Sequence, residues 1–240
     1  MRLLAALLCL VACRSSPEGE TARGPVAAAS DASAGTPGPS PGETSTVPGD
    51  PPTAFSSSIL RVSASDLPAS WRPGCPVAPD ELRMVKLSYW GFDDRAHEGS
   101  LVVNASAAQA MVDVFRRLYD ERFPIRRMEP IDVFGGSDEA STEADNTAAF
   151  NCRNAVATGA PHWSMHAYGL AIDVNPVENP YLLAGQILPP SGEAYLDRSR
   201  YRPGMAVEGG VLTSAFAAVG WQWGGRWASP DYQHFSSNGS

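Results

Sequence analysis

The sequence lacks an apolar run long enough to cross a membrane. Its longest such run lies within the first 13 residues, whereas a spanning helix needs about 20 apolar residues. Basic residues are also scarce: 18 Lys and Arg stand against 26 Asp and Glu, for a formal net charge of −8, and only Lys86 is a lysine. A general nucleic-acid binder needs a basic face to neutralise phosphates. The sequence therefore argues against a transmembrane helix and against a nucleic-acid partner.

The amino terminus has the features of an export signal. Arg2 precedes a short apolar segment, and Leu10–Cys13 resembles the lipobox of bacterial lipoproteins, in which the cysteine is lipidated and becomes the new amino terminus. A plain secretion signal that contains a cysteine is the alternative. We expect residues 1–12 to be a signal peptide and acyl chains on Cys13 to anchor the protein to a membrane of the bacterial cell envelope.

Residues 13–54 are rich in Pro, Gly, Ser, Thr and Ala and contain almost no large apolar side chains. Such a segment cannot bury enough surface to offset the entropy lost on ordering. We predict a flexible tether there. One globular domain is expected over residues 55–240, which is enough chain for one core, and we expect a monomer.

Two cysteines remain once the signal and the lipidation site are set aside. Cys75 and Cys152 form an even pair in an exported protein, which predicts a disulfide. Its loop is long, so the bridge would contribute roughly 4 kcal/mol in the chain-entropy model. Two free buried thiols, or a thiol metal ligand, are the alternatives.

Hydrophobic periodicity predicts a hairpin followed by a helix. Residues 82–90 alternate at period two and residues 101–104 form a second short strand, with Gly91–Gly99 as the loop between them. Residues 106–123 carry apolar side chains at helical spacing. Ser106 and Gln109 match a capping box, and Pro124 ends the helix.

The rest of the chain predicts short strands mixed with helices. The expected elements are an extended segment at 125–134, an acidic loop at 137–145, a strand at 171–175, a helix at 212–220 and strands at 221–223 and 232–236. This mixture, with several hairpin-like connections, favours an α+β fold with a small antiparallel sheet and flanking helices over a doubly wound parallel sheet.

Metal-ligand side chains gather in two places near the carboxyl end. His166 and Asp173 are seven residues apart, which would put them on opposite faces of an unbroken strand. A turn at Tyr168–Gly169 would let them converge. His234 follows Asp231 by three residues.

Two imidazoles and one carboxylate are a suitable ligand set for zinc, which leaves a position for water in catalytic sites. The metal makes that water acidic, and a free carboxylate such as Asp231 could take its proton. Spacing alone does not establish such a site, because two His and two Asp in an exported domain are more often surface or core residues.

Two longer motifs carry a family resemblance. Trp163–Pro176 resembles the S-x-H-x-x-G-x-A-x-D signature of zinc D-alanyl-D-alanine carboxypeptidases, a family that includes L-alanyl-D-glutamate endopeptidases of phage endolysins. Residues 221–235 resemble its W-x-W-G-G-x-W…D-x-x-H-F element. Upstream blocks are similar to a bacterial subgroup, so the resemblance spans residues 82–236.

The resemblance implies the Hedgehog/D,D-peptidase fold, a small α+β zinc hydrolase. It implies that His166, Asp173 and His234 hold a Zn²⁺ ion and that Asp231 is the general base. His162, four residues before His166, has no role in the family signature, and we expect it at the rim of the site.

The resemblance also implies an arginine that stabilises the oxyanion. Arg153 is the candidate, because a guanidinium suits a developing negative charge, and Arg126 and Arg127 compete for the role. The segment 137–149 departs from the subgroup pattern, with Ala148 where a polar residue is common. The departure is expected to change substrate selection rather than the metal site.

The function that follows is a zinc peptidase acting on peptidoglycan stem peptides outside the cytoplasm. The resemblance leaves open whether it removes a terminal D-alanine or cuts within the stem. The alternative is a catalytically silent peptidoglycan-binding lipoprotein of the same fold. A serine hydrolase is a distant third, because Gly-x-Ser-x-Gly does not occur within residues 55–240.

Overall fold

The computed structural model describes residues 54–156 and 160–240. The predicted signal peptide, the lipidation site Cys13 and nearly all of the predicted tether lie outside the described residues. Those predictions, and the domain boundary at residue 55, therefore stay predictions.

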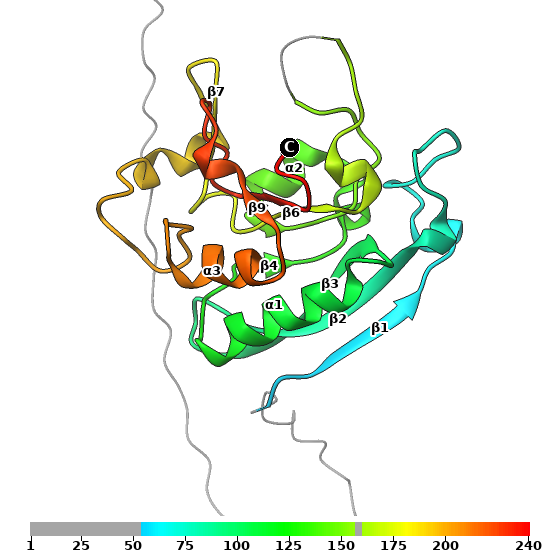
Figure 1. Ribbon diagram of the computed structural model, residues 1–240, viewed down its shortest axis with the longest axis horizontal. Helices are drawn as coiled ribbons and strands as arrows, with labels where there is room; N and C mark the ends of the chain where they lie inside the picture. The colour runs from blue at the N-terminus through cyan, green and yellow to red at the C-terminus, as the bar shows by residue number, and fades with distance from the viewer. Residues whose placement is uncertain (1–53, 157–159) are drawn as a thin grey trace, which may run out of the picture. The chain divides into compact units, whose positions relative to one another are not determined.

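A three-stranded antiparallel sheet forms the amino-terminal part of the described chain (Figure 1). β1 (Ser57–Arg61) pairs with β2 (Leu82–Trp90), which pairs with β3 (Ala96–Asn104). The period-two alternation sets Val85 opposite Leu101, and both side chains are fully buried. The strand predicted for this segment is confirmed.

β3 begins earlier than the sequence suggested. The expected loop over Gly91–Gly99 is much shorter, because Asp94 adopts a φ of 57° in a tight turn and strand pairing resumes directly after it. His97 consequently lies on the strand. Its Nε2 lies 2.9 Å from Oδ1 of Asp93, and its ring stacks on Tyr89.

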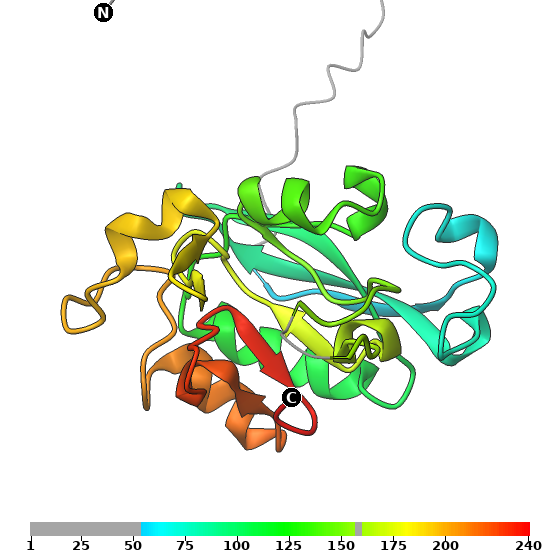
Figure 2. The same ribbon diagram turned by 90° about the horizontal axis from the view of Figure 1, so that it is seen from above.

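α1 (Ala108–Asp120) covers β2 and also packs against α3 (Val211–Ala218), as Figures 1 and 2 show. Its buried residues recur at helical spacing, so the predicted helix is confirmed. It ends before Pro124, and Arg122 has already left the helix with a φ of 49°.

The capping box predicted for α1 is wrong. The N-cap residue is Ala107, and the Ser106 hydroxyl donates instead to Oδ1 of Asn104 at 2.8 Å. Gln109 donates its amide to Asp113 one turn further on, at 3.0 Å. Both side chains thus have nearer partners than the backbone groups they were expected to cap.

A short parallel pair follows, formed by β4 (Arg127–Met128) and β5 (Asn146–Thr147). Between them lie the 3₁₀ helix η3 (Ile131–Phe134) and the helix α2 (Asp138–Glu143). The segment 125–134 is therefore only partly extended.

The acidic loop expected over 137–145 is wrong, since most of it is α2. Ser137 is its N-cap, and its hydroxyl accepts a hydrogen bond from the Ala140 amide at 3.1 Å. Asp138 and Glu139 occupy the first turn, where negative charge is favourable next to the helix amino terminus.

A second antiparallel sheet has the order β6 (Ala171–Asp173), β10 (His234–Ser236) and β9 (Gln222–Trp223). The strands predicted there are confirmed, although each is shorter than expected. An unpredicted hairpin, β7 (Tyr181–Leu183) with β8 (Gln186–Leu188), precedes α3. The remaining short elements are 3₁₀ helices: η1 (Ala64–Asp66), η2 (Pro79–Glu81), η4 (Met165–Tyr168), η5 (Pro190–Tyr195) and η6 (Gly224–Arg226).

The main core joins the two sheets through α1 and α3. Phe216 of α3 stacks on Phe235 of β10 with ring centroids 4.2 Å apart, and both are fully buried. Trp221 is buried in the same core and Trp223 packs against it. Burial of each such ring contributes about 1.5–3 kcal/mol, so this core fixes β10 and the residues it carries.

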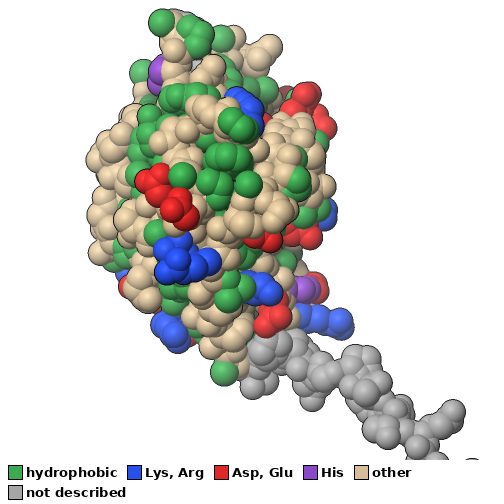
Figure 3. Space-filling view, turned by 90° about the vertical axis from the view of Figure 1, so that its right-hand side faces the viewer, with side chains coloured by type: hydrophobic (Ala, Val, Ile, Leu, Met, Phe, Trp, Pro, Cys, Tyr) green, Lys and Arg blue, Asp and Glu red, His purple; other side chains and the backbone are tan. Residues whose placement is uncertain are grey.

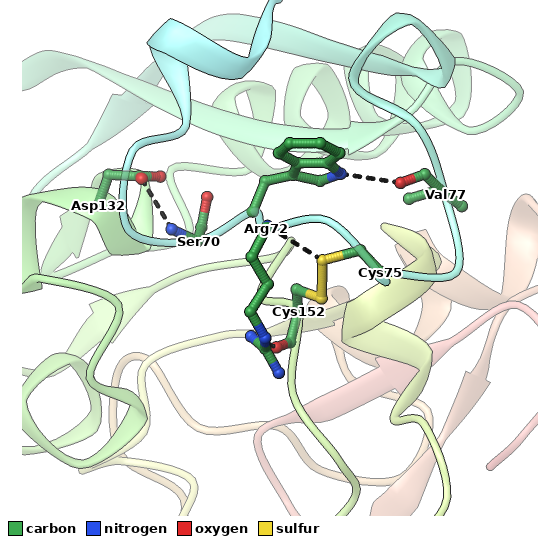
Figure 4. The surroundings of a disulfide bond; sticks show 7 residues. Ser70, Arg72, Cys75, Val77, Asp132 and Cys152 are labelled. Atoms are coloured by element: carbon green, nitrogen blue, oxygen red, sulfur yellow. Dashed lines mark hydrogen bonds between the residues drawn. A yellow bond between two sulfur atoms is a disulfide. The ribbon is translucent and has the colours of Figure 1, made fainter.

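The predicted disulfide between Cys75 and Cys152 is confirmed (Figure 4). The two Cα atoms lie 5.8 Å apart and 77 residues apart in sequence. Arg72 lies beside the bridge and donates from Nη1 to the Cys152 carbonyl at 2.5 Å. The bridge lies in a second apolar cluster with Leu67 and Phe150.

The described residues thus form a mixed α and β structure with small sheets and few helices. No helix within them has the length and apolar character that a membrane crossing requires. Figure 3 shows one face of the molecule, on which acidic and basic side chains are interspersed with small apolar areas.

Candidate metal centre

A bend between η4 and β6 brings His166 toward Asp173. Ser164 begins η4, and its hydroxyl accepts a hydrogen bond from the His166 amide at 3.3 Å. Gly169 ends η4 with a φ of 66°, a backbone conformation that glycine adopts without steric cost. The turn predicted at Tyr168–Gly169 is confirmed. It interrupts the chain between His166 and Asp173, so the two side chains need not point to opposite faces of one strand.

Strand pairing supplies the third side chain. β10 runs antiparallel to β6, and its register sets His234 directly opposite Asp173. Backbone bonds with Ala148 hold the other edge of Asp173, at 2.9 and 3.1 Å. Ala148 contributes through its backbone, so the absence of a polar side chain at this position leaves the cluster intact.

His166, Asp173 and His234 form a cluster whose candidate ligand atoms all lie within 4.8 Å of one another. Oδ2 of Asp173 lies 3.2 Å from Nε2 of His166, and Oδ1 lies 3.1 Å from Nδ1 of His234. The same two ring nitrogens are 3.3 Å apart, and both imidazoles are almost fully buried.

The outward-facing ring nitrogens of both histidines are already paired. His166 Nδ1 lies 2.6 Å from the Ala149 carbonyl oxygen, and His234 Nε2 lies 3.3 Å from the backbone oxygen of Ser240. A ring nitrogen that donates to a carbonyl leaves the other with its lone pair exposed, the usual arrangement of metal-binding histidines. The two lone pairs and the Asp173 carboxylate then face one point, which fits a divalent cation with nitrogen and oxygen ligands.

The Asp173 carboxyl group is held ionised. Burial alone would raise its pKa, but the adjacent His166 and His234 rings outweigh burial and hold the pKa far below its usual range. The group therefore offers a permanent negative charge to the cluster.

Asp231 lies beside the cluster but is not part of it. Only 8 % of Asp231 is exposed, and its Oδ1 has no hydrogen-bond partner. Burial, and then the charge of Asp173, raise the pKa of Asp231 to about 7. A buried carboxyl group poised near neutral pH with a free oxygen is suited to accept and return a proton.

The structure distinguishes the three arginines considered for stabilising the oxyanion. Arg153 lines the cleft over the cluster, and its Nε donates to Oδ1 of Asp138 at 2.9 Å. Arg126 lies over the Phe92 ring and Arg127 pairs with Glu129, and neither lines the cleft. Arg153 is therefore the arginine placed to meet a bound ligand.

The cleft above the cluster has a volume of about 730 Å³. Besides the predicted residues, it is lined by two elements that the sequence did not reveal, α2 and the β7–β8 hairpin. His162 lies on its lining, as expected for a rim residue, and so does Trp227, whose ring centroid lies 5.2 Å from that of His234. Trp163 also lines the cleft.

Gln233 is a cleft residue that sequence reasoning missed. Only 5 % of Gln233 is exposed, and its Oε1 has no hydrogen-bond partner. It lies between Asp231 and His234 in the second motif, and its position directly before His234 was the only available signal.

Residues 158–237 match the family model described as D-alanyl-D-alanine carboxypeptidase. The matched segment contains the whole cluster and Asp231, and it confirms the resemblance that the two motifs carry. No curated protein and no solved structure matches the chain.

Proposed function

We propose, from the match of residues 158–237 to the family model described as D-alanyl-D-alanine carboxypeptidase, that the protein is a zinc-dependent peptidase of peptidoglycan stem peptides. The observation that carries the proposal is the convergence of His166, Asp173 and His234, with Asp231 beside them, whose buried Oδ1 has no hydrogen-bond partner. The fold we assign to it is that of the Hedgehog/D,D-peptidases.

Zinc fits the donor set, and His166 Nε2, His234 Nδ1 and the Asp173 carboxylate would hold it. When bound, zinc makes a coordinated water molecule acidic and polarises the scissile carbonyl. Donation from His166 Nδ1 to the Ala149 carbonyl and from His234 Nε2 to the Ser240 backbone oxygen would keep both imidazoles in the tautomer that metal binding requires.

Asp231 moves the proton in the proposed reaction. Its free Oδ1 accepts a proton from the attacking water and returns it to the departing amine. Burial raises the pKa of Asp231 above that of a free carboxyl group, which strengthens the group as a proton acceptor.

Arg153 stabilises the negative charge that develops on the carbonyl oxygen. Its Nε is tied to Asp138, which fixes the side chain on the cleft lining. A guanidinium held in place contributes most in the transition state, because it need not reorganise as charge develops.

The place of action that we propose is the bacterial cell envelope. The lipobox-like Leu10–Cys13 supports export and membrane anchoring through Cys13, and the Pro-rich segment 13–54 would give the peptidase domain reach toward the wall. Mass spectrometry of the mature amino terminus should find diacyl or triacyl lipid on Cys13; an unmodified cysteine would refute the anchor.

The reaction is tested with the zinc-loaded protein and defined muropeptides, with products identified by mass spectrometry. Asp231→Asn should lower kcat by about 100-fold or more while zinc content stays at one per chain. His166→Ala should lose the zinc itself. His162→Ala is the matched control, because this histidine lines the cleft outside the cluster, and it should retain zinc and turnover.

A folded, zinc-loaded protein that releases no product from any stem peptide would refute the peptidase. Peptidoglycan pull-down that persists in the same protein, unaffected by Asp231→Asn, would instead support the silent wall-binding alternative.

A further inference from the structure

Two hydrogen-bond acceptors on the cleft lining are buried without a donor. They are Oε1 of Gln233 and Oδ1 of Asp231, and no donor of the described residues reaches either atom. Both residues are almost fully buried. A buried acceptor that lacks a donor destabilises the folded state, so this part of the cleft suits a ligand that brings the missing donor. The proposed reaction gives a role to Asp231 but none to Gln233.

Backbone hydrogen bonds hold Gln233 next to the metal centre. Its carbonyl oxygen accepts from the Val174 amide at 3.0 Å, and Val174 directly follows Asp173 of β6. The Asp231 carbonyl oxygen accepts from the His234 amide at 3.3 Å, which turns the chain between these two residues. The Gln233 side chain therefore projects from a backbone that is fixed on both sides.

The Gln233 side chain also contacts the Asp231 carboxylate. Burial raises the pKa of Asp231, and a side-chain hydrogen bond from Gln233 acts in the opposite direction. A carboxylate only accepts, so the donor is Nε2 of the Gln233 amide. This contact fixes which end of the amide faces Asp231, and it leaves Oε1 as a free acceptor close to the same carboxylate.

The free Oε1 lies on the side of the cleft from which the amine departs. In the proposed reaction Asp231 returns a proton to the departing nitrogen, so that nitrogen lies within hydrogen-bond reach of the carboxylate. It is then also near Oε1 of Gln233. A peptide nitrogen carries one N–H group, which is the donor that Oε1 lacks.

We infer that Gln233 accepts a hydrogen bond from the N–H of the scissile amide and so selects substrates whose leaving residue carries that N–H. This inference rests on the proposed function, since it places the scissile nitrogen beside Asp231. An imino acid or a hydroxy acid in the leaving position has no N–H to donate, and the oxygen of a hydroxy acid sets its lone pairs against Oε1.

The same contact orients the nitrogen for proton transfer. The nitrogen gains a free lone pair as the carbonyl carbon becomes tetrahedral, and an N–H held at Gln233 Oε1 directs that lone pair toward Asp231. The proton then passes from Asp231 to the lone pair, the C–N bond breaks, and the amine leaves.

Binding of stable analogues tests the inference without turnover. In each analogue a tetrahedral phosphorus group replaces the scissile carbonyl, and the leaving position carries NH, CH₂ or O. One set is built on acetyl-D-Ala-D-Ala and one on acetyl-L-Ala-D-Glu, so that both candidate scissile bonds are covered. Calorimetry with the zinc-loaded protein should give the order NH, CH₂, O from tightest to weakest, with NH about tenfold tighter than O.

Gln233→Met keeps the length of the side chain and removes the acceptor. It should bring the NH and O analogues to within about twofold of each other, because the hydrogen bond and the lone-pair repulsion both disappear. Zinc should remain at one per chain. Gln186→Met is the matched control, because Gln186 is exposed on β8 outside the cleft lining, and it should keep the full preference.

The comparison of the three analogues in the unaltered protein requires no variant, and Gln233→Leu is a second apolar replacement if Gln233→Met does not fold. Equal affinity of the NH and O analogues for the unaltered protein would overturn the inference, as would failure of every analogue to bind. A preference that persists at full size in folded Gln233→Met would overturn the assignment to this residue.

The proposed function fails on a different measurement. A protein that cleaves stem peptides but does not distinguish the NH and O analogues would remain a peptidase and lose only the inference. A protein that prefers the NH analogue but releases no product from any stem peptide would refute the peptidase and retain Gln233 as the acceptor.

Discussion

Glu178 is a buried carboxyl group outside the cleft lining. Only 1 % of it is exposed; its Oε1 lies 3.5 Å from Nη2 of Arg126 and 3.4 Å from the Tyr195 hydroxyl, and its Oε2 has no partner. Burial, and then the neighbouring Asp145, raise the pKa of Glu178 to about 8. The folded protein therefore keeps this group protonated at neutral pH, while the unfolded chain ionises it near pH 4.3.

This difference makes stability depend on pH. Between about pH 4.3 and 8 the folded state binds one more proton than the unfolded state at this site, so the free energy of unfolding falls as pH rises. Glu178→Gln, which stays neutral, should match the wild type near pH 4 and exceed it by about 2–4 kcal/mol at pH 8. Denaturant unfolding across that range measures the difference.

Glu121→Gln controls for the loss of an exposed carboxylate at the end of α1. A gap between Glu178→Gln and wild type that stays constant from pH 4 to pH 8 would show that Glu178 is ionised in the folded protein.

At the scale of elements, the η4–β6 bend depends on Gly169. A Cβ added there would meet the Asn104 backbone nitrogen at 2.5 Å and the Val103 carbonyl carbon at 3.0 Å, and neither backbone atom can move alone. Gly220 has a similarly positive φ, 82°, with open space around it. An alanine at either position would have a strained backbone, but only at position 169 would its Cβ also collide with neighbouring atoms.

Gly220→Ala should therefore cost about 1 kcal/mol of unfolding free energy, and Gly169→Ala at least about 3 kcal/mol. Gly169→Ala should also weaken zinc binding, because the bend sets His166 against Asp173. Urea titration and zinc competition measure the two effects. Equal costs for the two variants would show that the close approach to β3 does not constrain the bend.

The elements also show where sequence reasoning reaches and where it stops. The strand at 82–90 and the helix α1 were predictable, because long periodic segments pack one face on the core. α2 was missed because its six acidic and small residues lack an apolar stripe, and the Ser137 cap and first-turn charges specify it instead.

The candidate site was predictable only as a set of motifs. The seven-residue spacing of His166 and Asp173 does not reveal that η4 and Gly169 turn one toward the other. The local sequence also does not reveal that β10 pairs with β6, which sets His234 beside Asp173 although 61 residues separate them. The resemblance named Arg153 as the candidate but left Arg126 and Arg127 as competitors, and only the cleft lining distinguishes the three.

At the scale of the whole molecule, the disulfide connects the amino-terminal loops to the wall of the cleft. Cys152 directly precedes Arg153, and Cys75 lies before the first residue of β2. The metal cluster, however, lies entirely after the bridge, on η4, β6 and β10, and its sheet is closed by backbone pairing and by the Phe216–Phe235 stack. The bridge should thus stabilise the fold without shaping the cluster.

Cys75→Ala with Cys152→Ala should lower the free energy of unfolding by roughly 4 kcal/mol, because the unfolded chain gains the entropy of a 77-residue loop. The same variant, at a temperature where it remains folded, should bind zinc with unchanged affinity. Reductant should produce the same loss in the wild type and none in the variant, which separates the bridge from the packing of the two side chains. Weaker zinc binding by the folded variant would show instead that the covalent link holds the cleft wall, and through it the cluster, in place.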